Sequence, residues 1–373
     1  MKKGWEYKKL GEVANVNHGK NQKEVEDVHG KYPIYGSGGN IMGYANNYLC
    51  DAGTTILGRK GTINNPIFIE TKFWNVDTAF GISAKEGTDK KYIYYFVKSQ
   101  DWSKKDTGTT LPSLTQKVVK DTAIPIPPLS EQQRIVSHLD SAFAKIDAVA
   151  KNAENSLNDA KALFQSALTK MMEPKEGWEE KTLENIVDKG TSISYGIVQP
   201  GNGVEEGVPV VRPVDLKENI VYSSKNLKRT TKEISDSYKR TILNGKEVLM
   251  CVRGTTGITS LSSTSLKGYN VTRGIVPIKI GNDILRSFVY YTLKAPHAVD
   301  FIQLHTKGAA LKQINIADVK RIPIYVPSLS TQQSIVSALD SLRSKVDQLQ
   351  SNLTHTLTEC ATLKQSILRE TFE

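Results

Sequence analysis

Apolar and small residues recur in alternating steps of four and three along two long stretches of the chain. The first stretch runs from about Ile135 to Met171, and the second begins at Ile335. This spacing is typical of the seam of a coiled coil, which one helix cannot bury alone. The pattern therefore predicts two long helices that pack together, each about 40 residues and on the order of 60 Å long. Further along, the seam is expected to include Val149, Leu163 and Leu363.

The two stretches are copies of one another at a separation of 200 residues. One copy opens with Ser130–Val136 and the other with Ser330–Val336, each after prolines or a proline. In both copies Ser is followed three residues later by Gln, the spacing of a capping box. The expected N-caps and N3 partners are Ser130 with Gln133 and Ser330 with Gln333. The first seam residues are expected to be Ile135, Leu139, Ile335 and Leu339.

The direction in which the helices pair does not follow from side-chain volume. An antiparallel pair places Ile135 beside Ile367, whereas a parallel pair stacks Ala142 on Leu342, and both arrangements combine acceptable sizes. We prefer the antiparallel pair because it makes the duplicated halves a pseudo-twofold unit. The alternative is two unrelated long helices, each buried in an ordinary core.

The duplication extends beyond the helices. Residues Gly4–Leu10 resemble Gly177–Leu183, so each copy consists of a head followed by a helix. Both heads have short apolar runs separated by Gly and Asn, which predict β-rich domains, with short helices over Lys90–Lys98 and Leu285–Lys294. The predicted fold class is α+β, with two β-rich heads joined by two long helices in an antiparallel coiled coil. The predicted division is head 1–123, helix 124–176, head 177–321 and helix 322–373.

Positive charge is concentrated in the heads, although the whole chain has a net charge of +10. Lys and Arg outnumber Asp and Glu by 18 to 13 over residues 1–123 and by 21 to 14 over residues 177–321. The helical stretches 124–176 and 322–373 have 6 against 7 and 4 against 5. This distribution is what two polyanion-binding heads on a neutral helical support would show.

Residues able to perform chemistry do not form a recognisable constellation. The three cysteines lie far apart without a C-x-x-C pair, and the six histidines have no metal-ligand spacing. Neither a phosphate-binding G-x-x-x-x-G-K-[ST] loop nor an Asn/Asp-Pro-Pro-Tyr/Phe methylation motif occurs. We therefore expect no catalytic and no metal site in this chain. The absence of a long apolar run favours a cytoplasmic protein.

The doubled arrangement closely resembles the specificity subunit of bacterial type I restriction–modification systems. The resemblance rests on Leu129–Val136 and Leu329–Val336, with support from Trp5 and Trp178, and it covers essentially the whole chain. It implies two target-recognition domains, each reading one half of a bipartite DNA sequence, on a helical spacer. It also implies two adenine-N6 methyltransferase partner subunits, which bind S-adenosylmethionine, and restriction subunits that translocate DNA with ATP and Mg. This chain itself would hold no cofactor.

Two pairs of matching loops are the best candidates for DNA contact. Arg59–Thr62 corresponds to Val252–Thr255, each directly after an apolar strand, and Thr107–Leu111 corresponds to Lys307–Leu311. Cations here would bind phosphates, and Arg, Asn or Gln would reach base edges. The candidates in the first head are Lys20, Tyr35, Ser37, Arg59, Lys60 and Thr109. Those in the second head are Tyr195, Arg212, Arg253, Thr255, Arg273 and Lys307.

Two other functions are compatible with parts of this pattern. A fused enzyme with its own nuclease or methylase activity would need the motifs that the sequence lacks. A coiled-coil structural organiser, with basic heads that bind acidic proteins, would need neither those motifs nor DNA. Competition between a defined and a random duplex would separate the organiser from a DNA reader.

Overall fold

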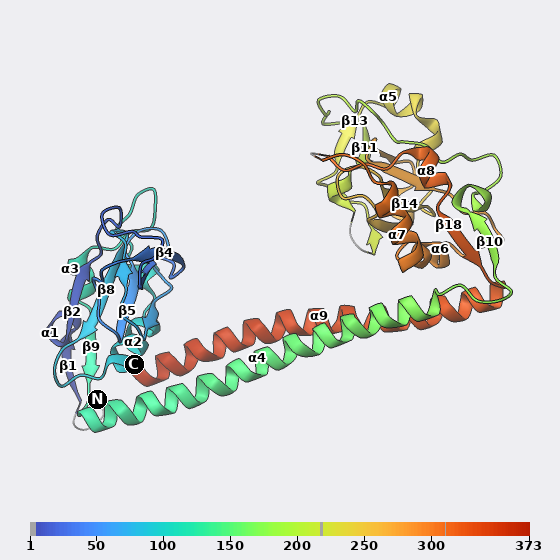
Figure 1. Cartoon of the computed structure of the whole chain (residues 1–373). Helices are drawn as coiled ribbons and strands as arrows, with labels where there is room; N and C mark the ends of the chain where they lie inside the picture. The colour runs from blue at the N-terminus through green and yellow to red at the C-terminus, as the bar shows by residue number, and fades with distance from the viewer. Residues whose placement is uncertain (1–4, 217–218, 310) are drawn as a thin grey trace. The chain divides into compact units, whose positions relative to one another are not determined.

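The computed structural model describes residues 5–216, 219–309 and 311–373. Gly4 of the first repeat and Ala310 of the second loop, both used above, lie outside this range. The chain forms two compact units, one of Met1–Asn155 with Ser351–Glu373 and the other of Ser156–Gln350 (Figure 1). They are called unit 1 and unit 2 below, and each is a β-rich head with parts of both long helices.

Unit 1 is built on a four-stranded sheet with the order β2-β8-β5-β6, in which all neighbours are antiparallel. A three-stranded sheet, β4-β3-β7, packs beside it, and β1 pairs with β9. The strands are β1 (Glu6–Lys9), β2 (Ala14–His18), β3 (Tyr32–Tyr35), β4 (Ile41–Ala45), β5 (Thr54–Gly58), β6 (Ile67–Ile69), β7 (Trp74–Asn75), β8 (Ala79–Ala84) and β9 (Ala123–Ile126). The short helices are α1 (Leu10–Val13), α2 (Lys90–Ser99) and α3 (Gln116–Lys120).

Strand β5 is buried along its whole length because it is covered on both faces. Leu57 belongs to the core that α2 closes, whereas Ile56 packs in a second cluster with Phe73. This explains why the strand reads as a continuous apolar run rather than an alternating one. Helix α2 begins at a side-chain cap, where Asp89 accepts a hydrogen bond of 2.9 Å from the Tyr92 backbone N–H.

Unit 2 repeats this plan with a change at each edge of the larger sheet, where β12 is added parallel to β15 and the strand equivalent to β2 is reduced. Its sheets have the orders β12-β15-β14-β17 and β13-β11-β16, and β10 pairs with β18. The position of β2 is held by a single bridge between Val187 and Ile280. The strands are β10 (Glu179–Thr182), β11 (Val208–Val211), β12 (Ile220–Val221), β13 (Lys228–Thr230), β14 (Val248–Cys251), β15 (Thr259–Ser262), β16 (Asn270–Val271), β17 (Ile275–Ile278) and β18 (Pro323–Val326). The short α-helices are α5 (Lys232–Ser237), α6 (Arg286–Thr292), α7 (Pro296–His305) and α8 (Ile316–Lys320).

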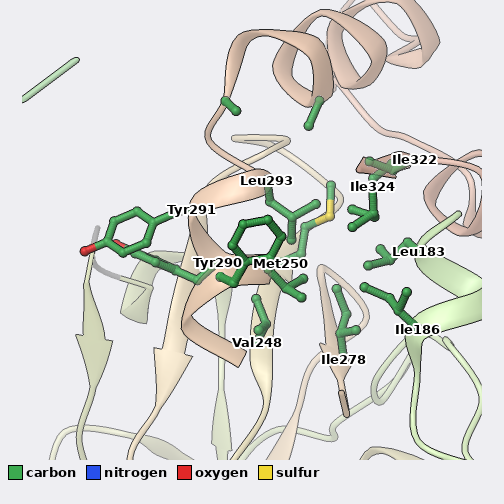
Figure 2. Packing of buried hydrophobic residues seen from close by; sticks show 14 of the residues in the cluster. Leu183, Ile186, Val248, Met250, Ile278, Tyr290, Tyr291, Leu293, Ile322 and Ile324 are labelled. Atoms are coloured by element: carbon green, nitrogen blue, oxygen red, sulfur yellow. The ribbon is translucent and has the colours of Figure 1, made fainter. Parts of the chain in front are cut away.

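The core of unit 2 forms where β14 and β17 meet α6 (Figure 2). Val248 and Met250 from β14 and Ile278 from β17 pack against Tyr290 and Leu293, and all five are nearly inaccessible to solvent. Burying an apolar side chain of this size contributes about 2 kcal/mol. Further members of the cluster come from both ends of the head: Leu183, Ile186, Ile322 and Ile324.

The two long helices, α4 (Leu129–Met171) and α9 (Leu329–Phe372), pair in antiparallel fashion within each unit. In unit 1, Leu139 near the start of α4 shares a core with Leu368 near the end of α9. In unit 2, Leu168 near the end of α4 shares a core with Leu339 near the start of α9. The predicted fold class, including the antiparallel helix pair, is confirmed.

The predicted seam is right at several positions and wrong at others. Ile135, Leu139, Ile335 and Leu339 are buried as expected, and so are Ile146, Val346 and Leu353 further along. In contrast, Val149 is 55% exposed, Leu163 60% and Leu363 50%. The buried residues of α4 include a set spaced eleven residues apart, Ile135, Ile146, Leu157 and Leu168, beside Val136, Leu139 and Phe143 near the start of the helix. An 11-residue repeat corresponds to about 3.67 residues per turn, close to the 3.6 of a straight helix, so a strict step of 3.5 drifts off the buried face.

The predicted helix caps are also wrong. Both helices begin one residue before the expected Ser, so Ser130 and Ser330 lie inside the first turn. Ser328 is the residue whose hydroxyl accepts a hydrogen bond, of 3.3 Å, from the Thr331 backbone N–H. The expected partners Gln133 and Gln333 are exposed, and the neighbouring Gln in each copy is the structural residue.

Candidate functional site

Gln132 and Gln332 attach each long helix to its own head by the same three-membered network. The side-chain amide of Gln132, 1% exposed, accepts from the Asp89 backbone N–H at 2.9 Å and donates to the Pro127 carbonyl at 2.9 Å. In unit 2, Gln332 accepts from Leu285 N–H at 2.9 Å and donates to the Pro327 carbonyl at 3.0 Å. Both polar ends of a buried amide are therefore satisfied, which fixes the start of the helix against the head.

A carboxylate eight residues further along the helix, about two turns away, makes a second matched attachment. Tyr95 donates its hydroxyl to Asp140 in unit 1, and Tyr291 donates to Asp340 at 2.6 Å in unit 2. Burial is the largest cause that raises the pKa of both tyrosines, and the neighbouring carboxylate adds to it. These phenols therefore stay protonated and remain donors throughout the neutral pH range.

The predicted contact loops of the first head meet at one edge, where several strands end. Strands β2 and β5 both run antiparallel to β8, so their last residues lie beside the first residues of β8. In the smaller sheet β3 runs parallel to β7, which leads directly into β8. The loops after β2, β3, β5 and β7 therefore converge, and we call this set of residues the strand-end edge. In unit 1 it comprises Gly19–Lys20, Tyr35–Ser37, Arg59–Thr62, Val76–Thr78 and the loop Asp106–Ser113.

Backbone hydrogen bonds between the loops hold this edge together. The Lys20 N–H donates to Asn75 O at 3.0 Å, and the Arg59 N–H donates to Thr78 O at 2.8 Å. The Arg59 guanidinium also donates to the Asp77 carbonyl at 3.0 Å. The loop Asp106–Ser113 joins through Gly61, whose N–H donates to Pro112 O at 2.9 Å. Side chains on these loops are therefore presented by a connected backbone.

The second head has the same edge with the same hydrogen-bond register. Val252 N–H donates to Gly274 O at 2.8 Å, as Arg59 donates to Thr78, and Gly254 N–H donates to Lys312 O at 2.8 Å. Thr272 N–H donates to Val211 O at 2.9 Å. These bonds make Lys60 equivalent to Arg253. The edge in unit 2 comprises Tyr195–Ile197, Arg212, Val252–Thr255, Thr272–Gly274 and the described residues of 307–313.

A glycine in each head permits the close approach of two loops. A Cβ atom on Gly19 would lie 1.9 Å from the Val76 carbonyl oxygen, and one on Gly196 would lie 2.2 Å from the Val271 carbonyl oxygen. Cβ atoms essentially never come within 3.0 Å of an atom outside their neighbouring residues. Both positions therefore require glycine if the edge is to keep its shape.

Most of the predicted contact residues lie on these edges with accessible side chains. Arg212 differs from the others because its guanidinium donates twice to Asp215, at 2.9 Å each, and this hydrogen-bonded carboxylate raises the Arg212 pKa. The Tyr195 hydroxyl donates over 3.5 Å to Ile314 O, a marginal distance for a hydrogen bond. The exposed candidates are Lys20, Lys60, Thr109, Tyr195, Thr255, Arg273 and Lys307, and the partly buried ones are Tyr35, Ser37, Arg59, Arg212 and Arg253.

Two further features of the site were not predicted. Asp77 lies exposed in the middle of the first edge, between Val76 and Thr78, whose backbone atoms bond to neighbouring loops. Gln132 and Gln332 were passed over in favour of their exposed neighbours. No local sequence signal marked Asp77, which follows the two-residue strand Trp74–Asn75 after Val76.

Within the described part of the chain, His, Cys, Asp and Glu form no group of three or more that could hold a metal ion. Over the same residues, no helix has the length and apolar character needed to cross a membrane.

Comparison with known proteins gives a consistent family. The family profile described as type I restriction modification DNA specificity domain matches residues 2–158 and 175–359. The EcoBI specificity subunit of Escherichia coli is 25% identical, over 85% of this chain and 72% of its own length. A putative type I restriction enzyme specificity subunit of Haemophilus influenzae is 24% identical, over 93% of this chain and 90% of its own.

Solved structures show the same fold over the whole chain. A chain from a study of complex assembly and conformational transition of the type I R-M system has a TM-score of 0.75 at 20% identity, covering 99% of this chain and 97% of that one. The HsdS subunit of Thermoanaerobacter tengcongensis has a TM-score of 0.56 at 20% identity, covering 100% and 97%.

Proposed function

The chain belongs to the type I restriction–modification DNA specificity family, and from this premise we propose that each head reads one half of a bipartite duplex DNA target through its strand-end edge. The subunit recognises DNA sequence and is not itself catalytic. The observation that carries the proposal is that both heads bring their predicted cations to the same edge by the same backbone register.

The charges at the edge suit a polyanion. Lys20 and Lys60 in the first head, and Lys307 in the second, are exposed. Such side chains bind phosphates and release counterions, which supplies affinity and orientation but little sequence preference. Sequence preference then depends on the few polar side chains of the edge that reach base edges in the major groove.

The long helices set the spacing of the two half-sites in this proposal. Each helix is fixed to its head by Gln132 or Gln332, so a change in helix length would be transmitted to the distance between the half-sites. By the geometric logic of half-site spacing, the length of the unread gap follows from the support rather than from the heads.

The helices also dock the partners that the family implies. We infer two adenine-N6 methyltransferase subunits and, in the restricting complex, translocase–nuclease subunits. S-adenosylmethionine, ATP and Mg would then be bound by those partners, and the assembly would work in the cytoplasm. Exposed leucines occur at equivalent positions of the two helices, Leu163 and Leu363, and offer apolar area for such contacts. The alternative of a structural organiser that binds acidic proteins is not favoured by the family comparison.

The experiment is methylome sequencing of a host that produces this chain with its methyltransferase subunits. We expect one motif with two specified halves and a fixed unread gap, with a methylated adenine in each half. A single contiguous motif, or no motif, would contradict the proposal.

A second experiment measures DNA binding by variants of the strand-end edge. Lys60→Ala and Arg253→Ala should weaken binding of the complex to all duplexes alike and reduce the salt dependence by about one unit of slope each. Lys151→Ala, an exposed cation on α4, serves as the control with the same loss of charge. Equal weakening by Lys151→Ala would place the contact surface elsewhere.

A further inference from the structure

Asp77 and Arg273 occupy the same position of the two strand-end edges. Val76 N–H donates to the carbonyl that ends β3, and Thr272 N–H donates to the carbonyl that ends β11. On the other side, Thr78 O and Gly274 O accept from the residues that follow β5 and β14. The residue between these two anchors is Asp77 in the first head and Arg273 in the second.

The two edges also differ at the position directly after β5 and β14, where only the first head has an arginine. Arg59 follows β5 in the first head, but its equivalent in the second head is Val252, which is 1% exposed. The first head therefore combines a guanidinium at 59 with a carboxylate at 77, whereas the second, which also has Arg212 and Arg253 on its edge, has a buried valine at 252 and a guanidinium at 273.

The Asp77 carboxylate is not explained by an ion pair within the head. Arg59 bonds to the backbone carbonyl of Asp77, at 3.0 Å, and not to its carboxylate. Over the residues that the structure describes, the exposed carboxylate has neither a hydrogen-bond donor nor a cation within ion-pair distance. On a surface that faces phosphates, an isolated negative charge is repelled. A donor on a base edge would offset that repulsion.

We propose that position 77/273 is a specificity position, at which Asp77 accepts a hydrogen bond from a cytosine amino group and Arg273 donates to a guanine. An exocyclic N4 amino group is the base-edge donor that Asp and Glu accept from, and guanine O6 and N7 are the acceptors that Arg binds. This inference rests on the proposed function, because it assigns chemistry to two residues of the same edges.

The test uses the complex of the full chain with its methyltransferase subunits. Motifs are determined by methylome sequencing for the unchanged chain, Asp77→Ala, Arg273→Ala and the control Glu86→Ala. Glu86 is an exposed carboxylate beyond the opposite end of β8. Discrimination at each motif position is then measured with purified complex on matched duplexes.

Asp77→Ala should reduce discrimination at one cytosine of one half-site by roughly ten- to hundredfold, the range for a good base contact. Arg273→Ala should do the same at one guanine of the other half-site. Glu86→Ala should change neither. Assembly of each variant with the methyltransferase subunits shows that the chain is folded.

Two results would overturn the inference while leaving the proposed function intact. The motif could stay unchanged in Asp77→Ala while affinity rises for every sequence, as expected for a merely solvated carboxylate. The affected position could hold a base other than cytosine. If both variants altered the same half-site, the assignment of one half-site to each head would fail as well. If the unchanged chain gives no bipartite motif, the proposed function itself fails.

Discussion

The helix pairs of the two units make the same contact with the partners exchanged. In unit 1, Lys364 Nζ lies 5.5 Å from the centre of the Phe143 ring. In unit 2, Arg343 Cζ lies 5.9 Å from the centre of the Phe164 ring. Positions 143 and 343 are equivalent in the duplication, as are 164 and 364, so α4 supplies both aromatic rings and α9 both cations.

The attachments of the helices to the heads are instead identical in the two units. Gln132 and Gln332 make the same three-membered network, and a carboxylate accepts from a tyrosine in each. In the contacts between helix and head, equivalent positions carry the same residue types in both units. In the contact between the two helices, a cation lies over an aromatic ring in both units, but the cation and the ring stand at exchanged positions. The two helices are therefore complementary and not interchangeable.

The largest expected effect comes from the helix positions that both units bury completely. Leu139→Ala and Leu339→Ala should each destabilise their own unit by about 3 kcal/mol, because each leaves a cavity in a core where the side chain is 0% exposed. Leu163→Ala, at a 60% exposed position, should change stability by less than about 0.5 kcal/mol. Scanning calorimetry would measure the change in stability of each variant. Equal losses of stability at 139 and 163 would mean that Leu163 belongs to the buried helix interface, as the 3.5-residue spacing predicted.

Removing the buried amide should cost slightly less. Gln132→Leu and Gln332→Leu each leave a backbone N–H and a carbonyl without a partner, and we expect about 2–3 kcal/mol of destabilisation. The exposed neighbours provide matched controls, since Gln133→Leu and Gln333→Leu should be nearly neutral. Urea unfolding gives the free energy of unfolding of all four variants. A large difference between the losses at 132 and 332 would mean that the two helix-to-head attachments are not equivalent.

The exchanged cation and ring can be exchanged back. Phe143→Arg alone should destabilise unit 1 by about 2 kcal/mol, because it removes a buried ring from the core and brings a second cation to Lys364. Adding Lys364→Phe should recover much of the loss, since the pair then copies Arg343 over Phe164, and Asp147 can hold the new Arg as Asp347 holds Arg343 at 3.1 Å. A double-mutant cycle should give about 0.5–1 kcal/mol of coupling. Additive losses would mean that the exchange has no energetic basis.

The smallest effect distinguishes the units by their response to acid. Burial lowers the pKa of His297 in unit 2, and its buried Nε2 has no hydrogen-bond partner among the residues that the structure describes. The unfolded chain protonates this His near pH 6.5 while the folded unit keeps it neutral, so stability is lost as the pH falls below 6.5. His297→Leu should flatten this part of the stability–pH curve. An unchanged slope between pH 7 and 5 would assign the acid response to other groups.

Patterns that are local in the sequence predicted much of this molecule. The duplication, both long helices, helix α2 and the Arg59–Thr62 and Val252–Thr255 loops were all visible as short motifs. The seam failed at Val149 and Leu163 because a difference of about 0.1 residue per turn accumulates along a long helix. The capping residues failed because helix ends are set within one or two residues by hydrogen bonds to the head.

The site residues that the sequence did not reveal could be found only from the pairing of strands and from contacts between distant segments. Asp77 is recognisable only once β7 is paired with β3, and its equivalence to Arg273 only once both registers are known. A short stretch of sequence does not determine which distant strand it pairs with. For this reason Gln132, whose partner Asp89 is 43 residues away, looked no different from Gln133.

The tight contacts at Gly19 and Gly196 separate two parts of each head. The backbone framework of the loops must be conserved in shape, whereas the side chains that the loops present are free to change. Because the loops touch through backbone atoms there, the framework does not depend on the identity of the neighbouring side chains at 20, 77, 197 or 273. A gene for this chain could therefore drift from one target to another by single replacements, each intermediate still folding.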